Sequence, residues 1–212
     1  MKYMEKLKKD ALRLALWYIV VIIISFAGGY IVGPDYPVRT MAIVAIISNI
    51  AFVVYYSFWA MFLKDFKERY ESNESMPKGI RSGFIRKGLL AALFITVVIA
   101  ILYLSILSDN NAVSDVSKLR IIERVDKSVT ALAIVLTACA YFMFNKMTDK
   151  NSFMRTITVI LGVLTIMYVV YAVFSTSMDD IFSFILIVVE YVMQFVFFRK
   201  IHKGYEFTDP HK

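Results

Sequence analysis

Residues 181–198 read IFSFILIVVEYVMQFVFF, and this stretch decides the class of fold. Glu190 is its only acidic or basic residue, with nine residues of the stretch before it and eight after it. An α-helix rises ~1.5 Å per residue, so roughly 20 apolar residues cross the ~30 Å hydrocarbon core of a bilayer. The stretch is therefore typical of a transmembrane helix that carries one carboxylate near its middle.

Five more apolar blocks of this kind occur along the chain, and none of them contains an acid or a base. The predicted spans are residues 14–33, 41–63, 89–107, 129–144, 156–174 and 181–198. The composition agrees, since 59% of the 212 residues are hydrophobic, 19% are charged and the mean hydropathy is +0.65. An average soluble domain has about 45–50% apolar and about 25% charged residues. We predict an all-α integral membrane protein, a six-transmembrane-helix bundle that forms a single membrane domain.

The first block follows a basic segment, as the apolar core of a signal peptide does. Its length of about 20 residues exceeds the ~7–15 residues of such a core, so a retained span is favoured. Cleavage near the sequence SFAGG, residues 25–29, is the alternative.

The basic residues orient the predicted bundle. Nineteen of the 24 Lys and Arg residues lie in the N-terminal segment, the 64–88 and 145–155 connectors and the C-terminal tail. Cytoplasmic loops carry an excess of Lys and Arg, so both termini are predicted to be cytoplasmic, in the cell membrane. Residues 64–88 then form a basic cytoplasmic loop and residues 108–127 an extracytoplasmic loop. This distribution accounts for the net charge of +7 without a nucleic-acid partner.

Two connectors have features that favour partners. In residues 78–88, Ile80, Phe84 and Ile85 are predicted to share an apolar face among basic residues, which favours contact with anionic lipid. A solvated hinge is the alternative. In the outer connector, apolar residues recur at every third position from Val116 to Val125, which predicts a short amphipathic helix leading into the fourth span.

Small residues recur at four-residue spacing in three spans and predict close helix packing, within one chain, between copies in a homo-oligomer, or against another membrane protein. These packing candidates are Ser25, Gly29, Gly33, Gly88, Ala92, Thr96 and Gly162.

Glu190 is the principal candidate for a functional residue. A charge at the bilayer centre costs ~2.5–3.5 kcal/mol on insertion scales, and no span interior offers a Lys or Arg to offset it. The carboxyl group is therefore expected to be protonated, to face a hydrated cavity, or to hold a cation. The candidate proton- or cation-binding residues are Glu190, Gln194 and Ser183 on one helix face, and Asn49 of the second span. Further polar side chains are expected to line the same interior: Tyr56, Thr137, Tyr141, Thr165 and Tyr168.

No nucleotide-binding, zinc-protease or nucleophile-elbow motif occurs, and the single Cys139 has no His in any span. We therefore predict neither an enzyme nor a cofactor or metal site. An enzyme that acts on lipid is the least favoured interpretation, and two other functions are favoured over it. One is a transporter or channel-like protein for a small solute or cation. The other is an accessory, regulatory or immunity-type protein that binds another membrane protein.

Overall fold

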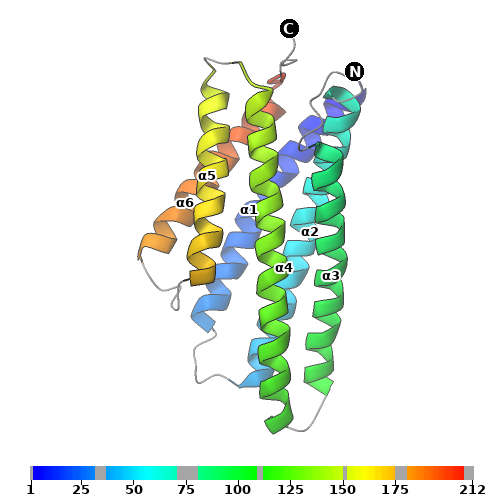
Figure 1. Ribbon diagram of the computed structural model, residues 1–212, viewed down its shortest axis with the longest axis vertical. Helices are drawn as coiled ribbons and strands as arrows, with labels where there is room; N and C mark the ends of the chain where they lie inside the picture. Colours follow the sequence, from blue (N-terminus) through cyan, green and yellow to red (C-terminus); the bar gives the residue numbers. More distant parts are fainter. Residues whose placement is uncertain are drawn as a thin grey trace.

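The computed structural model is helical in every regular element of its described residues, which are 2–31, 37–70, 81–108, 112–149, 152–174 and 181–207. The elements are α1 (Lys2–Ile31), α2 (Val38–Tyr70), α3 (Ser82–Ser108), α4 (Ala112–Lys146), α5 (Phe153–Phe174) and α6 (Ile181–His202). The helices lie side by side as a bundle, and the start of α1 and the end of α6 lie at the same end (Figure 1). We refer to it as the N/C end.

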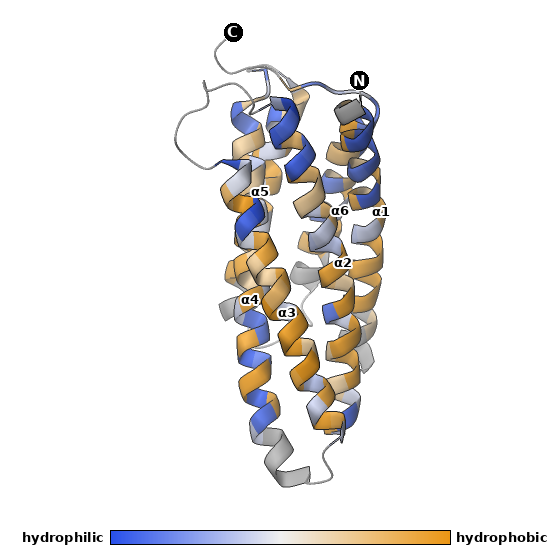
Figure 2. Ribbon diagram, turned by 90° about the vertical axis from the view of Figure 1, so that its right-hand side faces the viewer, coloured by the Kyte–Doolittle hydropathy of each residue, from blue (hydrophilic) through white to orange (hydrophobic). Residues whose placement is uncertain are grey.

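Four of these helices are long and apolar enough to cross a membrane within the described residues. They are α2, α3, residues 117–146 of α4 and residues 153–170 of α5. Their outer surfaces are apolar as well, since Phe94 is 70% exposed and Ile101 58%. Hydrophobic residues dominate the middle of the bundle, and hydrophilic ones gather toward the N/C end and in the part of α4 furthest from it (Figure 2). The length and composition of these helices, together with their apolar outer surface, make the chain a multi-pass helical membrane protein.

The helices extend beyond the predicted spans. The predicted outer loop, residues 108–127, is largely helix, because α4 already begins at Ala112 and continues without a break to Lys146. The predicted apolar face of the 78–88 segment is wrong for two of its members, since Ile85 is buried and Phe84 is 70% exposed. Adjacent residues of an α-helix point about 100° apart, so one of the two faces the bundle and the other faces outward. Ile80 lies outside the described residues.

Two glycines let helices approach α4 closely. A Cβ on Gly88 of α3 would lie 2.8 Å from Leu136 Cδ1, and one on Gly162 of α5 would lie 2.7 Å from Phe142 Cζ. Ala92 and Thr96 are also buried on α3. The surroundings of Ser25 and Gly29 in α1, and all of Gly33, lie outside the described residues.

Replacing Gly162 with Leu is expected to destabilise the protein by about 1–3 kcal/mol, although Leu is the better helix former, because the new side chain overlaps the Phe142 ring. Thermal unfolding in detergent, followed by circular dichroism, measures the effect. Val163→Leu is the matched control, because Val163 lies on the same helix and is 45% exposed. Equal melting temperatures for the two variants would show that α5 does not depend on close contact at Gly162.

An aromatic cluster fills the bundle toward the N/C end. Its members are fully buried and meet edge to face or stacked, with ring centroids 4.9–6.4 Å apart: Trp59, Phe62, Phe66, Phe144, Phe197 and Phe198. After α6 the chain turns at Gly204, whose φ of +102° suits a residue without a side chain. The turn brings Phe207 onto Phe66, with ring centroids 5.2 Å apart.

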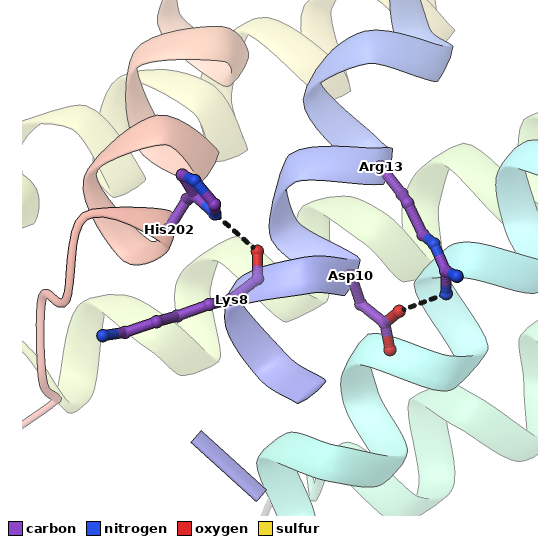
Figure 3. A network of polar contacts seen from close by, with 4 residues as sticks. All are labelled: Lys8, Asp10, Arg13 and His202. Carbon is purple, nitrogen blue, oxygen red and sulfur yellow. Dashed lines mark hydrogen bonds and ion pairs between the residues drawn. The ribbon is translucent and has the colours of Figure 1, made fainter. Parts of the chain in front are cut away.

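Polar contacts join the first and last helices at the same end (Figure 3). His202 Nδ1 donates to the Lys8 carbonyl over 3.0 Å, which identifies Nδ1 as the protonated nitrogen because a carbonyl only accepts. Asp10 is buried and pairs with Arg13 over 2.9 Å within α1.

Replacing Asp10 with Asn is expected to make stability less dependent on pH. Burial raises the pKa of Asp10 above its usual value of 3.8, and the hydrogen bond and charge of Arg13 offset part of that rise. The folded state therefore holds the proton more tightly than the unfolded state, and stability falls as pH rises from about 4 through the raised pKa. Melting temperatures across this range, with exposed Glu5→Gln as control, measure the effect. An Asn variant less stable than wild type at neutral pH would show that the Arg13 pair outweighs the burial.

Candidate functional site

Glu190 lies inside the bundle and contacts hydroxyl groups. The residue is 6% exposed, and the Thr165 hydroxyl of α5 donates to Glu190 Oε1 over 2.9 Å. Tyr18 of α1 also forms a side-chain hydrogen bond with the carboxyl group. Within the described residues these contacts involve no Lys or Arg, so Glu190 is held by neutral groups.

Phenol groups from four helices surround the carboxyl group of Glu190. Each of these phenol groups interacts electrostatically with Glu190. They are Tyr18 of α1, Tyr55 and Tyr56 of α2, Tyr141 of α4 and Tyr168 of α5. The rings of Tyr18 and Tyr55 are 5.4 Å apart between centroids. A hydroxyl group both donates and accepts, so these side chains can solvate either the ionised or the protonated form of Glu190.

Gln194, one turn after Glu190, has an unsatisfied polar atom. Its Nε2 donates to the Tyr55 hydroxyl over 2.9 Å and also to the Tyr141 hydroxyl. Its Oε1 is buried and has no hydrogen-bond partner among the described residues. If the amide group were flipped by 180°, Oε1 would accept from the two tyrosine hydroxyls and Nε2 would be the atom without a hydrogen-bond partner. Leaving such a group unpaired costs about 1–3 kcal/mol, so a water molecule or another polar group that pairs with this atom would stabilise the site.

The aromatic cluster separates this site from the N/C end. Trp59, Phe144 and Phe198 follow Tyr55, Tyr141 and Gln194 by one helical turn, on α2, α4 and α6. The Trp59 ring contacts Tyr141, with centroids 5.5 Å apart, and Phe198, with centroids 5.4 Å apart. The path from Glu190 to the N/C end is therefore filled by packed rings.

The structure places the predicted site residues in two groups. Glu190 and Gln194 share one site, together with the expected Thr165, Tyr141, Tyr56 and Tyr168. Asn49 lies elsewhere, and its Nδ2 donates to Asp126 Oδ2 over 3.2 Å. The Ser183 side chain lies outside the described residues.

Sequence reasoning missed Tyr18, Tyr55 and Asp126. Nothing in the sequence separates Tyr18 or Tyr55 from other aromatic residues of a span. Asp126 lies among charged residues, which favour a loop. The apolar spacing from Val116 to Val125 was the available signal, since it carries a helical face up to Asp126.

The chemistry of the Glu190 site is that of hard oxygen donors. One carboxylate, one amide and several hydroxyls suit a proton or a small cation. The described residues contain no cluster of three or more His, Cys, Asp or Glu side chains. Comparisons with known protein families, curated proteins and solved structures find no match to this chain.

Proposed function

We propose that the protein is a small transporter or channel-like protein that moves protons or a small cation across the membrane, with Glu190 as the binding residue. The observation that carries the proposal is a buried carboxyl group that contacts hydroxyls alone among the described residues, next to an amide with a polar atom that has no partner among them. Around a purely structural Glu, the neighbouring polar groups would all be expected to form hydrogen bonds. Here Gln194 Oε1 has no partner among the described residues, so a ligand can bind to it.

The neutral groups around Glu190 can form hydrogen bonds with both its ionised and its protonated form, so the residue can alternate between the two. When ionised, the carboxylate accepts from Thr165 and Tyr18 or binds a cation together with the amide oxygen of Gln194. When protonated, it donates to one of the same hydroxyls. The cost of a charge at this depth, ~2.5–3.5 kcal/mol, favours the neutral or cation-bound form. Binding and release of a positive charge are therefore the events expected to accompany transport.

The proposed topology has six spans with both termini in the cytoplasm. The 30 residues of α1 and the 22 residues of α6 correspond to about 45 Å and about 33 Å of helix, enough to cross a bilayer. The positive-inside rule then makes the basic N/C end cytoplasmic, where exposed Phe84 and its basic neighbours can meet anionic lipid. Single-cysteine variants in a Cys139→Ala background test this, because Lys203→Cys should be labelled from the cytoplasm and Glu123→Cys from outside. The opposite labelling would overturn the orientation.

The test of function is flux through purified protein in proteoliposomes. Vesicles with an imposed pH gradient or a Na⁺ or K⁺ gradient are compared with protein-free vesicles, using an internal pH dye and a cation-sensitive dye. Faster collapse of one gradient is the expected result, and the gradient that collapses identifies the ion. Wild-type vesicles that match empty vesicles under every gradient would overturn the transport function.

A further inference from the structure

A partly buried acid, Asp126, lies further from the N/C end of the bundle than the Gln194 amide of the Glu190 site. Asp126 of α4 meets Asn49 of α2 and Tyr103 of α3, both only 2% exposed. Asn49 Nδ2 donates to Asp126 Oδ2 over 3.2 Å, and the Tyr103 hydroxyl donates to the same oxygen over 3.3 Å. Three helices thus converge on one oxygen of one carboxyl group.

The other carboxylate oxygen of Asp126, Oδ1, receives neither of these hydrogen bonds. Oδ1 is buried and has no hydrogen-bond partner among the described residues. Two donors on Oδ2 direct a proton to Oδ1, where it meets no competing hydrogen atom. A buried carboxylate oxygen without a donor is costly, and protonation at Oδ1 removes the negative charge without disturbing the bonds to Asn49 and Tyr103.

The charged side chains near Asp126 do not neutralise its carboxylate in the way that a bound proton would. From α2 and α3 the facing polar groups are Asn49, which is neutral, and the Tyr103 phenol. On α4 the charges that act on Asp126 are Glu123 and Lys127. These two pair with each other over 2.7 Å, and both are exposed.

The two acids lie at successive levels of the bundle. Asn49 precedes Tyr55 by six residues on α2, and Asp126 precedes Tyr141 by 15 residues on α4. Tyr55 and Tyr141 both contact the Gln194 amide, so the Asp126 site lies further from the N/C end than that amide. Tyr103 is flanked on α3 by the exposed Ile101 and Leu104. The Asp126 site is therefore at the depth of the apolar surface, between Glu190 and the end of the bundle opposite the N/C end.

We propose that Asp126 is a second proton-binding residue, which takes a proton on Oδ1 from the water at the end of the bundle opposite the N/C end and releases it toward Glu190. The release step rests on the proposed function, whereas the protonation of Asp126 stands without it. The proton moves as H⁺ between water and the carboxylate, and no other reactant is needed.

Infrared difference spectroscopy of the reconstituted protein tests the protonation. Spectra at acidic and alkaline pH resolve the C=O stretch of each protonated carboxyl group. One band is expected to disappear in Asp126→Asn and persist in Glu190→Gln. Tyr103→Phe, which removes one donor from the carboxylate, should move the midpoint of that band to higher pH. Glu123→Gln is the control, since it alters an exposed acid one turn away on the same helix.

Flux through the same variants separates the two proposals. Asp126→Asn is expected to slow proton flux about tenfold or more. If wild type and Asp126→Asn share every pH-dependent band, or if Tyr103→Phe moves no midpoint, the proton site at Asp126 is overturned even where wild type transports. If the band is present but wild type shows no flux, the proton site stands and the transport function fails. Flux in Asp126→Asn equal to that of wild type would overturn the release toward Glu190.

Discussion

Vesicles that contain the Glu190→Gln variant are expected to show no more flux than protein-free vesicles, while the variant protein still folds. Gln has nearly the same shape as Glu, and its carbonyl can still accept from the Thr165 hydroxyl, which lies 2.9 Å from Glu190 Oε1. It has no negative charge to attract a cation and takes up no proton in the accessible pH range. The variant therefore removes the binding chemistry and keeps the packing. Flux and melting temperature are measured on the same preparation.

Two further variants make this result specific. Glu190→Asp keeps the carboxylate but retracts it by one methylene, so it should retain part of the flux. Glu123→Gln removes an acid that is 49% exposed and should retain all of it. Unchanged flux in Glu190→Gln would mean that Glu190 is a structural residue and that any transport uses another path.

The largest loss of stability is expected for Trp59→Ala. Trp59 is fully buried and contacts the rings of Tyr141, Phe144 and Phe198, with centroid distances of 5.4–6.4 Å. Truncating a buried aromatic side chain to Ala typically costs about 3–5 kcal/mol. Lipid tails are as apolar as the interior, so the loss arises mainly from broken packing. Thermal or denaturant unfolding in detergent measures it.

Phe94→Ala on α3 is the matched control, because Phe94 is 70% exposed on the apolar surface. Its truncation should change the free energy of unfolding by less than about 1 kcal/mol, since few contacts are lost. If the two variants were equally stable, the aromatic cluster would not hold the N/C end of the bundle together. Faster flux in Trp59→Ala would identify the cluster as the barrier between Glu190 and that end.

The polar interior could be predicted only in part from the sequence. Glu190 and Gln194 fall on one helix face because four residues make about one turn, which is a local property of any α-helix. Their partners are not local. The sequence predicts Asn49 in the Glu190 site, but Asn49 donates to Asp126 instead. Tyr55, six residues later on α2, accepts a hydrogen bond from Gln194. Contacts between helices depend on how each helix is rotated about its axis and how deep it lies in the bundle. The periodicity of residues along one helix specifies neither of these quantities.

The sequence by itself determined that this protein is helical and belongs in a membrane. Apolar runs of about 20 residues can satisfy their backbone groups in lipid only as helices, so fold class follows from composition along the chain. Only the tertiary structure decided how those helices meet. Gly162 meets Phe142, and the carboxyl group of Glu190 meets Thr165 and Tyr18, because close packing selects one arrangement among many that the apolar pattern allows.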